Sequence, residues 1–322
     1  MQATSIYEPI QQSLKRVEAG LKTLGSDLQF PFLSQVLGHV FDTTGKAMRP
    51  AITLLSANFH PHEGRIIEIM ATAVELLHIA SLIHDDTVDE SSVRRGQATI
   101  GSLWGRNVAV LVGDYIFAAS ATQVCDTGNV RVIRRFSETI MELSRGELSE
   151  MVESYARDQT REQYLRRIYN KTASLFTTAG ESGAVLSGAP EEVVQALKAY
   201  GYNLGIAFQM VDDILDFEGT QEEIGKPVGS DLAHGIMTLP AILAIELYPD
   251  DKTIDALFRD PDDPMHLQRA VEMIQNSSAT SDSYGEARSF CAKAVGALDA
   301  LPRNVSRESL EELVEYVIER RR

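Results

Sequence analysis

The chain has 322 residues, 44% of them hydrophobic, so it can bury a sizeable core in one large domain or two smaller ones. Its 30 lysines and arginines against 46 aspartates and glutamates give a formal net charge of -16, which disfavours nucleic acid and anionic membrane surfaces as partners. No uninterrupted apolar run approaches the ~18–20 residues of a membrane span, which argues against a transmembrane segment.

Helical periodicity dominates the chain and strand-like alternation is scarce, so the sequence predicts an all-α fold. We expect core helices over about 65–89 and 195–217 and a helical segment over 164–176. The polar stretch 276–283 is predicted to be a loop, because its side chains compete for backbone hydrogen bonds. No break between the helices resembles a domain linker, so we expect a single domain over 1–322.

Cysteine usage bears on the compartment. Cys125 and Cys291 are the two cysteines, they lack metal-ligand spacing, and no secretory leader is evident. A reduced, cytoplasmic setting is therefore expected, with both residues as core thiols.

Two aspartate clusters with the same internal spacing follow the two predicted core helices. Each places carboxylates one turn apart at the end of a buried helix, where they require a cationic partner. Oxygen ligands of this kind suit magnesium, which takes one or two carboxylates per ion and completes its shell with water and phosphate oxygens. The sequence therefore predicts a magnesium-bound diphosphate. The clusters are Asp85, Asp86 and Asp89, and Asp212, Asp213 and Asp216.

The helix before the first cluster carries a polar stripe on an otherwise apolar surface. His78 precedes Asp85 by two turns and Ser81 precedes it by one, so they share a face with Asp89. A lone histidine on such a helix is commonly a satisfied core residue. Its place in this stripe favours a ligand-binding role.

Short basic motifs supply the cationic donors that a diphosphate needs besides metal. Any one of them alone would be read as solvated surface charge. Together with the aspartates they predict an anion site. They contain Lys46 and Arg49, Arg94 and Arg95, Lys171, and Lys226.

These motifs stand in an order that resembles the trans-type isoprenyl diphosphate synthases, the polyprenyl synthetase family. The similarity runs from about residue 45 to 240. A lone aspartate motif would be weak evidence, whereas two, each followed by a basic motif, are specific. The matching segments are GKAMRP, ELLHIASLIHDDTVDESSVRRG, SLWG, GDY, NKTASL, FQMVDDILDF, GKPVGSDL and TLP.

The resemblance implies a single-domain helical bundle around a deep central cavity, the isoprenoid synthase fold, usually dimeric. It implies that the six aspartates hold three Mg2+ ions on an allylic diphosphate, partly through water. The allylic diphosphate would contact Arg94, Lys171 and Lys226. The second substrate, isopentenyl diphosphate, would be held by Lys46, Arg49, His78 and Arg95. Thr172 and Gln209 would lie beside the reacting carbons.

The implied reaction is ionisation of the allylic diphosphate, attack by the alkene of isopentenyl diphosphate, and proton loss to the released diphosphate. Dipoles of Thr172, Gln209 and the Lys171 carbonyl would stabilise the carbocation while water is excluded. One departure from the family pattern is Ile236, where many members carry lysine; it removes one phosphate contact, which Lys226 or His234 would replace.

Product length is expected to depend on the helix wall below the first cluster. In the family, bulky residues four and five positions before the first aspartate close the tunnel. Here they are Ser81 and Ala80, with Leu77 one turn further. The small side chains favour a long-chain all-trans product, suited to a quinone side chain and handed to membrane enzymes. Helix packing alone would also explain them.

Other activities stay open at this point. A shorter-chain synthase, making geranylgeranyl or farnesyl diphosphate, shares the same motifs. A terpene cyclase would not need the isopentenyl diphosphate residues, and a non-catalytic prenyl-diphosphate-binding subunit would be expected to lose aspartates. A membrane-embedded prenyltransferase is excluded by the missing spans.

Overall fold

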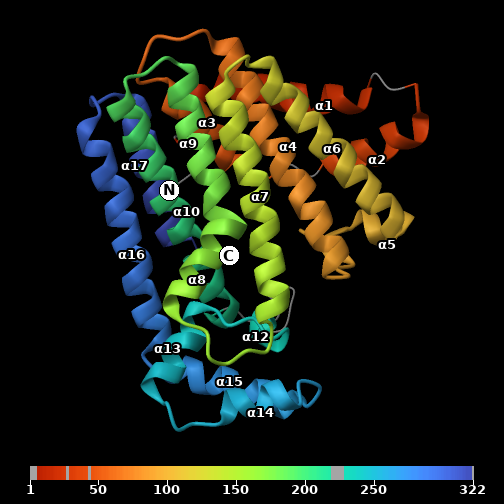
Figure 1. Ribbon diagram of the computed structural model, residues 1–322, viewed down its shortest axis with the longest axis vertical. Coiled ribbons are helices and arrows are strands. Elements are labelled where there is room, and N and C mark those ends of the chain that lie inside the picture. Colours follow the sequence, from red (N-terminus) through yellow and green to blue (C-terminus); the bar gives the residue numbers. More distant parts are fainter. Residues whose placement is uncertain (1–5, 27–28, 43–44, 219–227, 321–322) are drawn as a thin grey trace. The chain divides into compact units, whose positions relative to one another are not determined.

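The computed structural model describes residues 6–26, 29–42, 45–218 and 228–320. These residues are almost entirely helical (Figure 1), which confirms the predicted all-α fold. Besides the helices, the described residues form one antiparallel hairpin of β1 (Val93–Arg94) and β2 (Gln97–Ala98), in which Val93 pairs with Ala98.

The chain divides into two compact units. Unit 1 comprises Met1–Glu138, Leu175–Lys198 and Ala300–Leu310, and unit 2 comprises Thr139–Ser174, Ala199–Asp299 and Glu311–Arg322. The single domain expected over 1–322 stays a prediction.

Unit 1 is built around the long apolar helix α4, against which α1, α3 and α6 pack. Alanine, leucine and isoleucine, which are strong or moderate helix formers, make up 11 of the 25 residues of α4, and the helix is buried around its circumference from Met70 to Leu77. The helices of this unit are η1 (Glu8–Ile10), α1 (Gln11–Ser26), α2 (Pro31–Asp42), α3 (Met48–Ala57), α4 (Gly64–Val88), α5 (Ile100–Trp104) and α6 (Arg106–Asp126).

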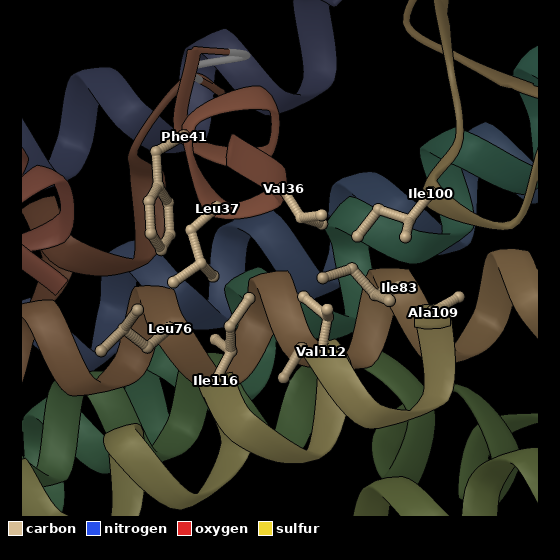
Figure 2. Close-up of a cluster of buried hydrophobic side chains, with 10 residues drawn as sticks. Val36, Leu37, Phe41, Leu76, Ile83, Ile100, Ala109, Val112 and Ile116 are labelled. Atoms are coloured by element: carbon tan, nitrogen blue, oxygen red, sulfur yellow. The ribbon is translucent and has the colours of Figure 1, made fainter. Parts of the chain in front are cut away.

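Helices α4 and α6 lie side by side in Figure 1, and a glycine lets them approach closely. A Cβ atom on Gly113 would lie 2.3 Å from Nε2 of His84. Side chains of α2, α4, α5 and α6 interdigitate nearby (Figure 2). This cluster comprises Val36, Leu37, Phe41, Leu76, Ala80, Ile83, Ile100, Ala109, Val112 and Ile116.

Unit 2 holds the short helices of the C-terminal half, with α13 packed on α15 and α16. Its helices are α8 (Arg161–Ile168), the π-helix η2 (Tyr169–Ala173), α12 (Ser230–Ala233), α13 (Leu239–Leu247), α14 (Thr253–Arg259), α15 (Pro264–Gln275) and α16 (Ala279–Ala297). Five further helices contribute residues to both units: α7 (Val130–Glu153), α9 (Ser174–Leu186), α10 (Glu191–Glu218), η3 (Leu298–Ala300) and α17 (Val305–Glu319).

Two local expectations need correction and one is confirmed. The predicted loop 276–283 is a loop only to Ser278, because α16 begins at Ala279 and buries side chains such as Ala287 and Cys291. The expected helical segment 164–176 is helical throughout, and it contains the π-helix, which local propensity does not reveal. Cys125 is exposed rather than a core thiol, whereas Cys291 is buried.

Two helices, α4 and α6, are long and apolar enough to cross a membrane by length and composition, contrary to the expectation that no stretch approaches this. In α4, 61% of the apolar window is buried inside the protein, and in α6 33%. Core helices of soluble proteins pass the same test, so the pair is weak evidence for membrane spans.

Candidate active site

The first aspartate motif stands at the C-terminal end of α4. Asp85 and Asp86 lie in its last turn and Asp89 is the C-cap, whose N–H donates to the Asp85 carbonyl at 2.8 Å. The negative end of the helix dipole adds to these carboxylates, so the helix end attracts cations. Arg94 on β1 neutralises part of this negative charge, since its Nε donates to Oδ1 of Asp86 at 2.6 Å.

A cavity of about 140 Å³ opens beside this helix end. One face of α4 lines it with Glu75, His78, Ile79, Leu82, Ile83 and Asp86. Arg94 and Arg95 line it from the hairpin, and apolar side chains of α1 and α2, among them Val17, Leu21 and Phe41, complete the wall. The cavity thus joins cationic groups to an apolar interior, and it brings together the sequence-predicted residues His78, Asp86, Arg94 and Arg95.

Burial and mutual repulsion set the charges around this cavity. Burial lowers the pKa of Arg49 to about 10, with Glu75 opposing the shift, so the guanidinium remains charged at neutral pH. Burial, followed by Arg49, Arg95 and Arg94, holds the pKa of His78 well below its usual value. His78 is therefore neutral, able both to donate and to accept a hydrogen bond.

Arg49 has one buried N–H group without a hydrogen-bond partner among the described residues. Its guanidinium lies over the Phe176 ring, 4.6 Å from the centroid, and the N–H group in question is that of Nε. Burial raises the pKa of Glu75, which Arg49 and Arg95 counteract. An unsatisfied buried N–H costs about 1–3 kcal/mol, and an anionic ligand would remove that cost.

The basic loops are held in uncommon backbone conformations. Arg95 (φ 51°) and Gly96 (φ 77°) form the two-residue turn between β1 and β2, and Ala47 (φ 48°) precedes α3. Left-handed conformations of non-glycine residues carry strain and cluster at ligand sites. A Cβ atom on Gly45 would lie 2.7 Å from Nη1 of Arg95, so this glycine admits the guanidinium. Lys46, between Gly45 and Ala47 in the sequence, is exposed, and its carbonyl accepts from the Tyr7 hydroxyl at 2.7 Å.

The predicted chain-length residues lie on another face of α4. Leu77 and Ala80 are fully buried, and Ala80 belongs to the apolar cluster of Figure 2. Ser81 is partly buried and donates to the His78 carbonyl at 2.9 Å. The cavity described above is lined by none of the three. Their role in product length stays a prediction.

In unit 2, Lys171 stands in the π-helix η2, whose extra residue alters the direction of the side chains that follow it. Its ammonium group pairs with Glu147 and Glu150 of α7. Helix α7 approaches η2 so closely that a Cβ atom on Gly146 would lie 2.7 Å from the Lys171 backbone nitrogen.

A chain of hydrogen bonds links α8, η2 and α10. The Tyr164 hydroxyl donates to Oδ2 of Asp213 at 2.7 Å. The Gln209 amide donates to Oδ1 of Asp213 at 2.8 Å and accepts from the Thr172 hydroxyl at 2.6 Å. The predicted pair Thr172 and Gln209 is thus in direct contact.

The charge state of this chain reflects its burial. Burial and Asp231 raise the pKa of Asp213 to about 7, against the hydrogen bonds from Tyr164 and Gln209. Burial and the Asp213 carboxylate raise the pKa of Tyr164 well above its usual value, so the phenol stays protonated.

The other two carboxylates of the second motif also have partners. Arg320 pairs with Asp212 and lies over the Phe208 ring. Oδ2 of Asp216 accepts from the Asp231 backbone N–H at 3.1 Å.

In neither aspartate motif do three carboxylates bring their oxygen atoms within 4.8 Å of one another, among the described residues. Among the described residues, ligand atoms of three acidic or histidine side chains lie within 4.8 Å of one another at Asp260, Asp263 and His266, away from both motifs in the sequence. Carboxylates repel one another, which opposes a closer approach of the carboxylates within either motif when no cation is bound. Lys226 lies outside the described residues. Near Ile236, Nδ1 of His234 lies 2.7 Å from the Ser230 carbonyl.

Several residues with a place in these networks went unrecognised in the sequence: Tyr164, Glu147, Glu150, Asp231 and Arg320. Their partners are 15 to 108 positions away, so no local spacing reveals them. For Tyr164 the sequence does offer a signal: it precedes Lys171 by seven residues, or two helical turns, so a regular helix would place both on one face.

Comparison with known proteins agrees with this arrangement. The polyprenyl synthetase family matches residues 30–274. Heptaprenyl diphosphate synthase component 2 of Geobacillus stearothermophilus is 36% identical over 317 residues, which cover 98% of both chains. A decaprenyl diphosphate synthase from Rhodobacter capsulatus superimposes with a TM-score of 0.91 at 35% identity, covering 98% of each chain.

A polyprenyl synthase from Caulobacter crescentus, solved with calcium and isoprenyl diphosphate, superimposes with a TM-score of 0.93 at 31% identity. It covers all of this chain and 98% of the other. The family match over residues 30–274 spans the positions of both aspartate motifs and of the basic motifs. The chain therefore belongs to the polyprenyl synthetase family and is a chain-elongating prenyltransferase.

Proposed function

We propose that this enzyme condenses isopentenyl diphosphate with an allylic diphosphate, repeatedly, to give a long-chain all-trans polyprenyl diphosphate. The observation that carries the proposal is the unit 1 cavity, where arginines and a neutral histidine stand beside an apolar interior. An ionic head and a hydrocarbon tail are the two parts of the substrate that such a cavity recognises.

The size of the cavity supports isopentenyl diphosphate as its occupant. An engineered cavity of about 150 Å³ accommodates benzene, so a cavity of about 140 Å³ suits a five-carbon group. Arg95, Arg49 and Lys46 would neutralise its diphosphate, with the unpartnered Nε of Arg49 as one donor. His78 would donate from its neutral ring.

The carboxylates of both motifs, with Arg94, Lys171 and Lys226, are proposed to bind the allylic diphosphate and three magnesium ions. The donor set fits, because carboxylate oxygens are the hard ligands that magnesium prefers and α4 ends in a negative dipole. Asp85, Asp86, Asp89 and Asp212 would contribute most directly, since they are partly or fully exposed, whereas Asp213 and Asp216 are buried. Bound magnesium would supply Lewis-acid stabilisation of the leaving diphosphate.

The protein's own groups would then protect the allylic cation. Thr172, which is buried, and Gln209, which is partly buried, would present oxygen dipoles beside the reacting carbons. For Lys171 to reach phosphate, its ammonium must exchange Glu147 and Glu150 for the ligand. The proton lost after condensation would go to the released diphosphate, so no side-chain base is required.

The wider setting follows from the product. A long polyprenyl chain suits a quinone side chain and would pass to membrane enzymes, while the synthase itself would act in the cytoplasm. A homodimer is proposed, supported by the exposed apolar residues Val110 (40%) and Leu111 (68%) on α6. Sedimentation at several concentrations would test this; a monomer active at all of them would contradict it.

The decisive assay incubates the purified protein with isopentenyl diphosphate, magnesium and allylic primers of several lengths, and reads the products by mass. We expect a ladder that ends at a long all-trans chain. Products ending at farnesyl or geranylgeranyl diphosphate would identify the shorter-chain alternative, a single cyclic hydrocarbon a cyclase, and no turnover a non-catalytic subunit.

A paired substitution tests the assignment of the cavity. Arg95→Gln should raise the KM for isopentenyl diphosphate at least tenfold, since a charge-assisted bond contributes about 1.5–3 kcal/mol. Arg106→Gln is the matched control, because Arg106 is exposed and pairs with Glu90 in the same unit at 3.3 Å. An unchanged KM in Arg95→Gln would remove this arginine from the substrate site.

A further inference from the structure

We propose that Tyr164 is a positioning residue for the condensation: through Asp213 it fixes the orientation of the Gln209 amide, and through that amide the hydroxyl of Thr172. The inference rests on the proposed place of Gln209 and Thr172 beside the reacting carbons. Tyr164 itself would touch neither substrate.

The geometry is a continuous chain of three hydrogen bonds from 2.6 to 2.8 Å within unit 2. It runs from Tyr164 on α8 to Asp213 and Gln209 on α10, and ends at Thr172 in the π-helix. Tyr164 is fully buried and Asp213 is 3% exposed. Water therefore cannot easily replace either partner, and each bond matters more than it would on the surface.

The order of donors and acceptors in this chain is determined by the carboxylate. Both of its oxygens accept, each from a different side-chain donor. The Tyr164 hydroxyl donates to Oδ2, and the Gln209 amide must turn its NH2 group toward Oδ1. Its carbonyl oxygen then faces Thr172. With the amide reversed, two acceptor oxygens would meet at the 2.8 Å contact.

The end of the chain is where chemistry would benefit. Thr172 donates its only hydroxyl hydrogen to Gln209, which leaves the lone pairs of Oγ1 directed elsewhere. An oxygen with oriented lone pairs is a dipole that stabilises positive charge without reorganising during the reaction. Loss of the Tyr164 hydroxyl would free the carboxylate of Asp213 to rotate, and the amide and hydroxyl with it.

A purely structural role for Tyr164, anchoring α8 to α10, makes different predictions. Anchoring would change stability and all kinetic constants together, whatever residue stands at 209. If Tyr164 instead positions Gln209, its loss should slow the chemical step, and this effect should disappear in a variant that lacks the Gln209 amide. A double-mutant cycle separates the two.

The experiment compares wild type, Tyr164→Phe, Gln209→Ala and the double variant. We expect Tyr164→Phe to lower kcat about tenfold, while the KM for isopentenyl diphosphate changes less than about twofold. In the Gln209→Ala background the same substitution should lower kcat by less than about twofold. The affinity of each variant for magnesium with a non-reactive allylic thiodiphosphate should match that of wild type.

Tyr284→Phe is the matched control. The Tyr284 hydroxyl also donates at 2.7 Å to a carboxylate of α10, that of Glu218, which lies just beyond the second motif. Its loss should leave kcat unchanged.

Asp213→Asn keeps the experiment decisive if Tyr164→Phe folds poorly. The asparagine still offers Tyr164 an oxygen, but its NH2 group would face Gln209 and reverse the amide. We expect a larger kcat loss than in Asp216→Asn, because Asp216 is also a proposed magnesium contact but its Oδ2 accepts from the Asp231 backbone N–H. Equal, multiplicative losses from Tyr164→Phe in both backgrounds, or a kcat loss in Asp213→Asn no larger than in Asp216→Asn, would overturn the role while leaving the proposed function intact. A wild-type enzyme that forms no condensation product would overturn both.

Discussion

The guanidinium group of Arg320, just beyond the end of α17, donates to Oδ1 of Asp212, the first carboxylate of the second aspartate motif. Its Cζ atom lies 4.5 Å from the centroid of the Phe208 ring, so the side chain is both paired and stacked. Only 12% of the Arg320 side chain and 29% of the Asp212 side chain are exposed. The Arg320 guanidinium thus occupies the carboxylate of Asp212 to which the proposed function assigns a magnesium ion.

Removal of this arginine should make magnesium easier to bind. In wild type the Asp212 carboxylate must give up its ion pair with Arg320 before it can bind magnesium, and in Arg320→Ala it need not. Such an ion pair is worth about 1 kcal/mol, which corresponds to roughly fivefold in magnesium affinity. We expect half-maximal activity at a lower magnesium concentration, measured by titration of the steady-state rate. Arg288→Ala is the control, because the Arg288 guanidinium also lies over an aromatic ring, that of Tyr284, at 5.8 Å. A higher magnesium requirement in Arg320→Ala would instead make the arginine part of the substrate site.

Gly146→Ala tests the close approach of α7 to the π-helix. The new Cβ would lie 2.7 Å from the nitrogen and 3.0 Å from the Cα of Lys171, both backbone atoms that cannot rotate away. We expect a loss of about 1–3 kcal/mol in the free energy of unfolding, although alanine is favoured in helices by about 1 kcal/mol, and a lower kcat.

Gly285→Ala is the matched control on α16, where a Cβ would meet nothing within 4 Å. It should stabilise the protein by up to about 1 kcal/mol. Denaturant unfolding of both variants measures the difference. A Gly146→Ala protein as stable as Gly285→Ala would show that α7 can move away without cost.

Ala80→Phe tests the chain-length prediction. If Ala80 and Ser81 line the product tunnel, a bulky side chain should shorten the product and leave the first condensation largely intact. Ala80 is fully buried in the cluster of Figure 2, so overpacking should also cost about 1–3 kcal/mol of stability. Ser81→Phe, at a partly buried position, gives the same test with less strain. Products of wild-type length from both variants would leave helix packing as the reason for these small residues.

The stability of the protein should depend on pH through His78. Its folded-state pKa lies well below the usual 6.5, because burial and three arginines disfavour its charge. Below about pH 6.5 the unfolded chain binds a proton that the folded chain does not, so the free energy of unfolding falls as the pH falls.

We therefore expect wild type to lose more stability between about pH 7.5 and 5.5 than His78→Gln, measured by urea unfolding. His62→Gln is the control, since His62 is exposed and its Nδ1 lies 2.9 Å from the His60 carbonyl. Parallel slopes for wild type and His78→Gln would contradict a neutral, buried imidazole.

The sequence alone determined the parts of this protein that depend on local spacing. Apolar periodicity predicts α4 and α10 to within a few residues, because burial of a helix face requires that period. The repeated aspartate spacing places carboxylates at the ends of these helices, and the ordered motifs predict the family, which the comparisons confirm. Where local composition misled, as at 276–283, burial of α16 outweighed the loop preference of its polar residues.

Only the tertiary structure decided which partner each site residue has. Asp213 meets Tyr164 49 positions away, Asp212 meets Arg320 108 positions away, and Lys171 meets two glutamates of α7. The π-helix η2 likewise lies where Gly146 of α7 approaches the backbone of Lys171, a contact between distant segments. Local spacing governs which helix face a side chain occupies, whereas hydrogen bonds and ion pairs depend on the distance between helices. That distance is set by packing, which no single segment encodes.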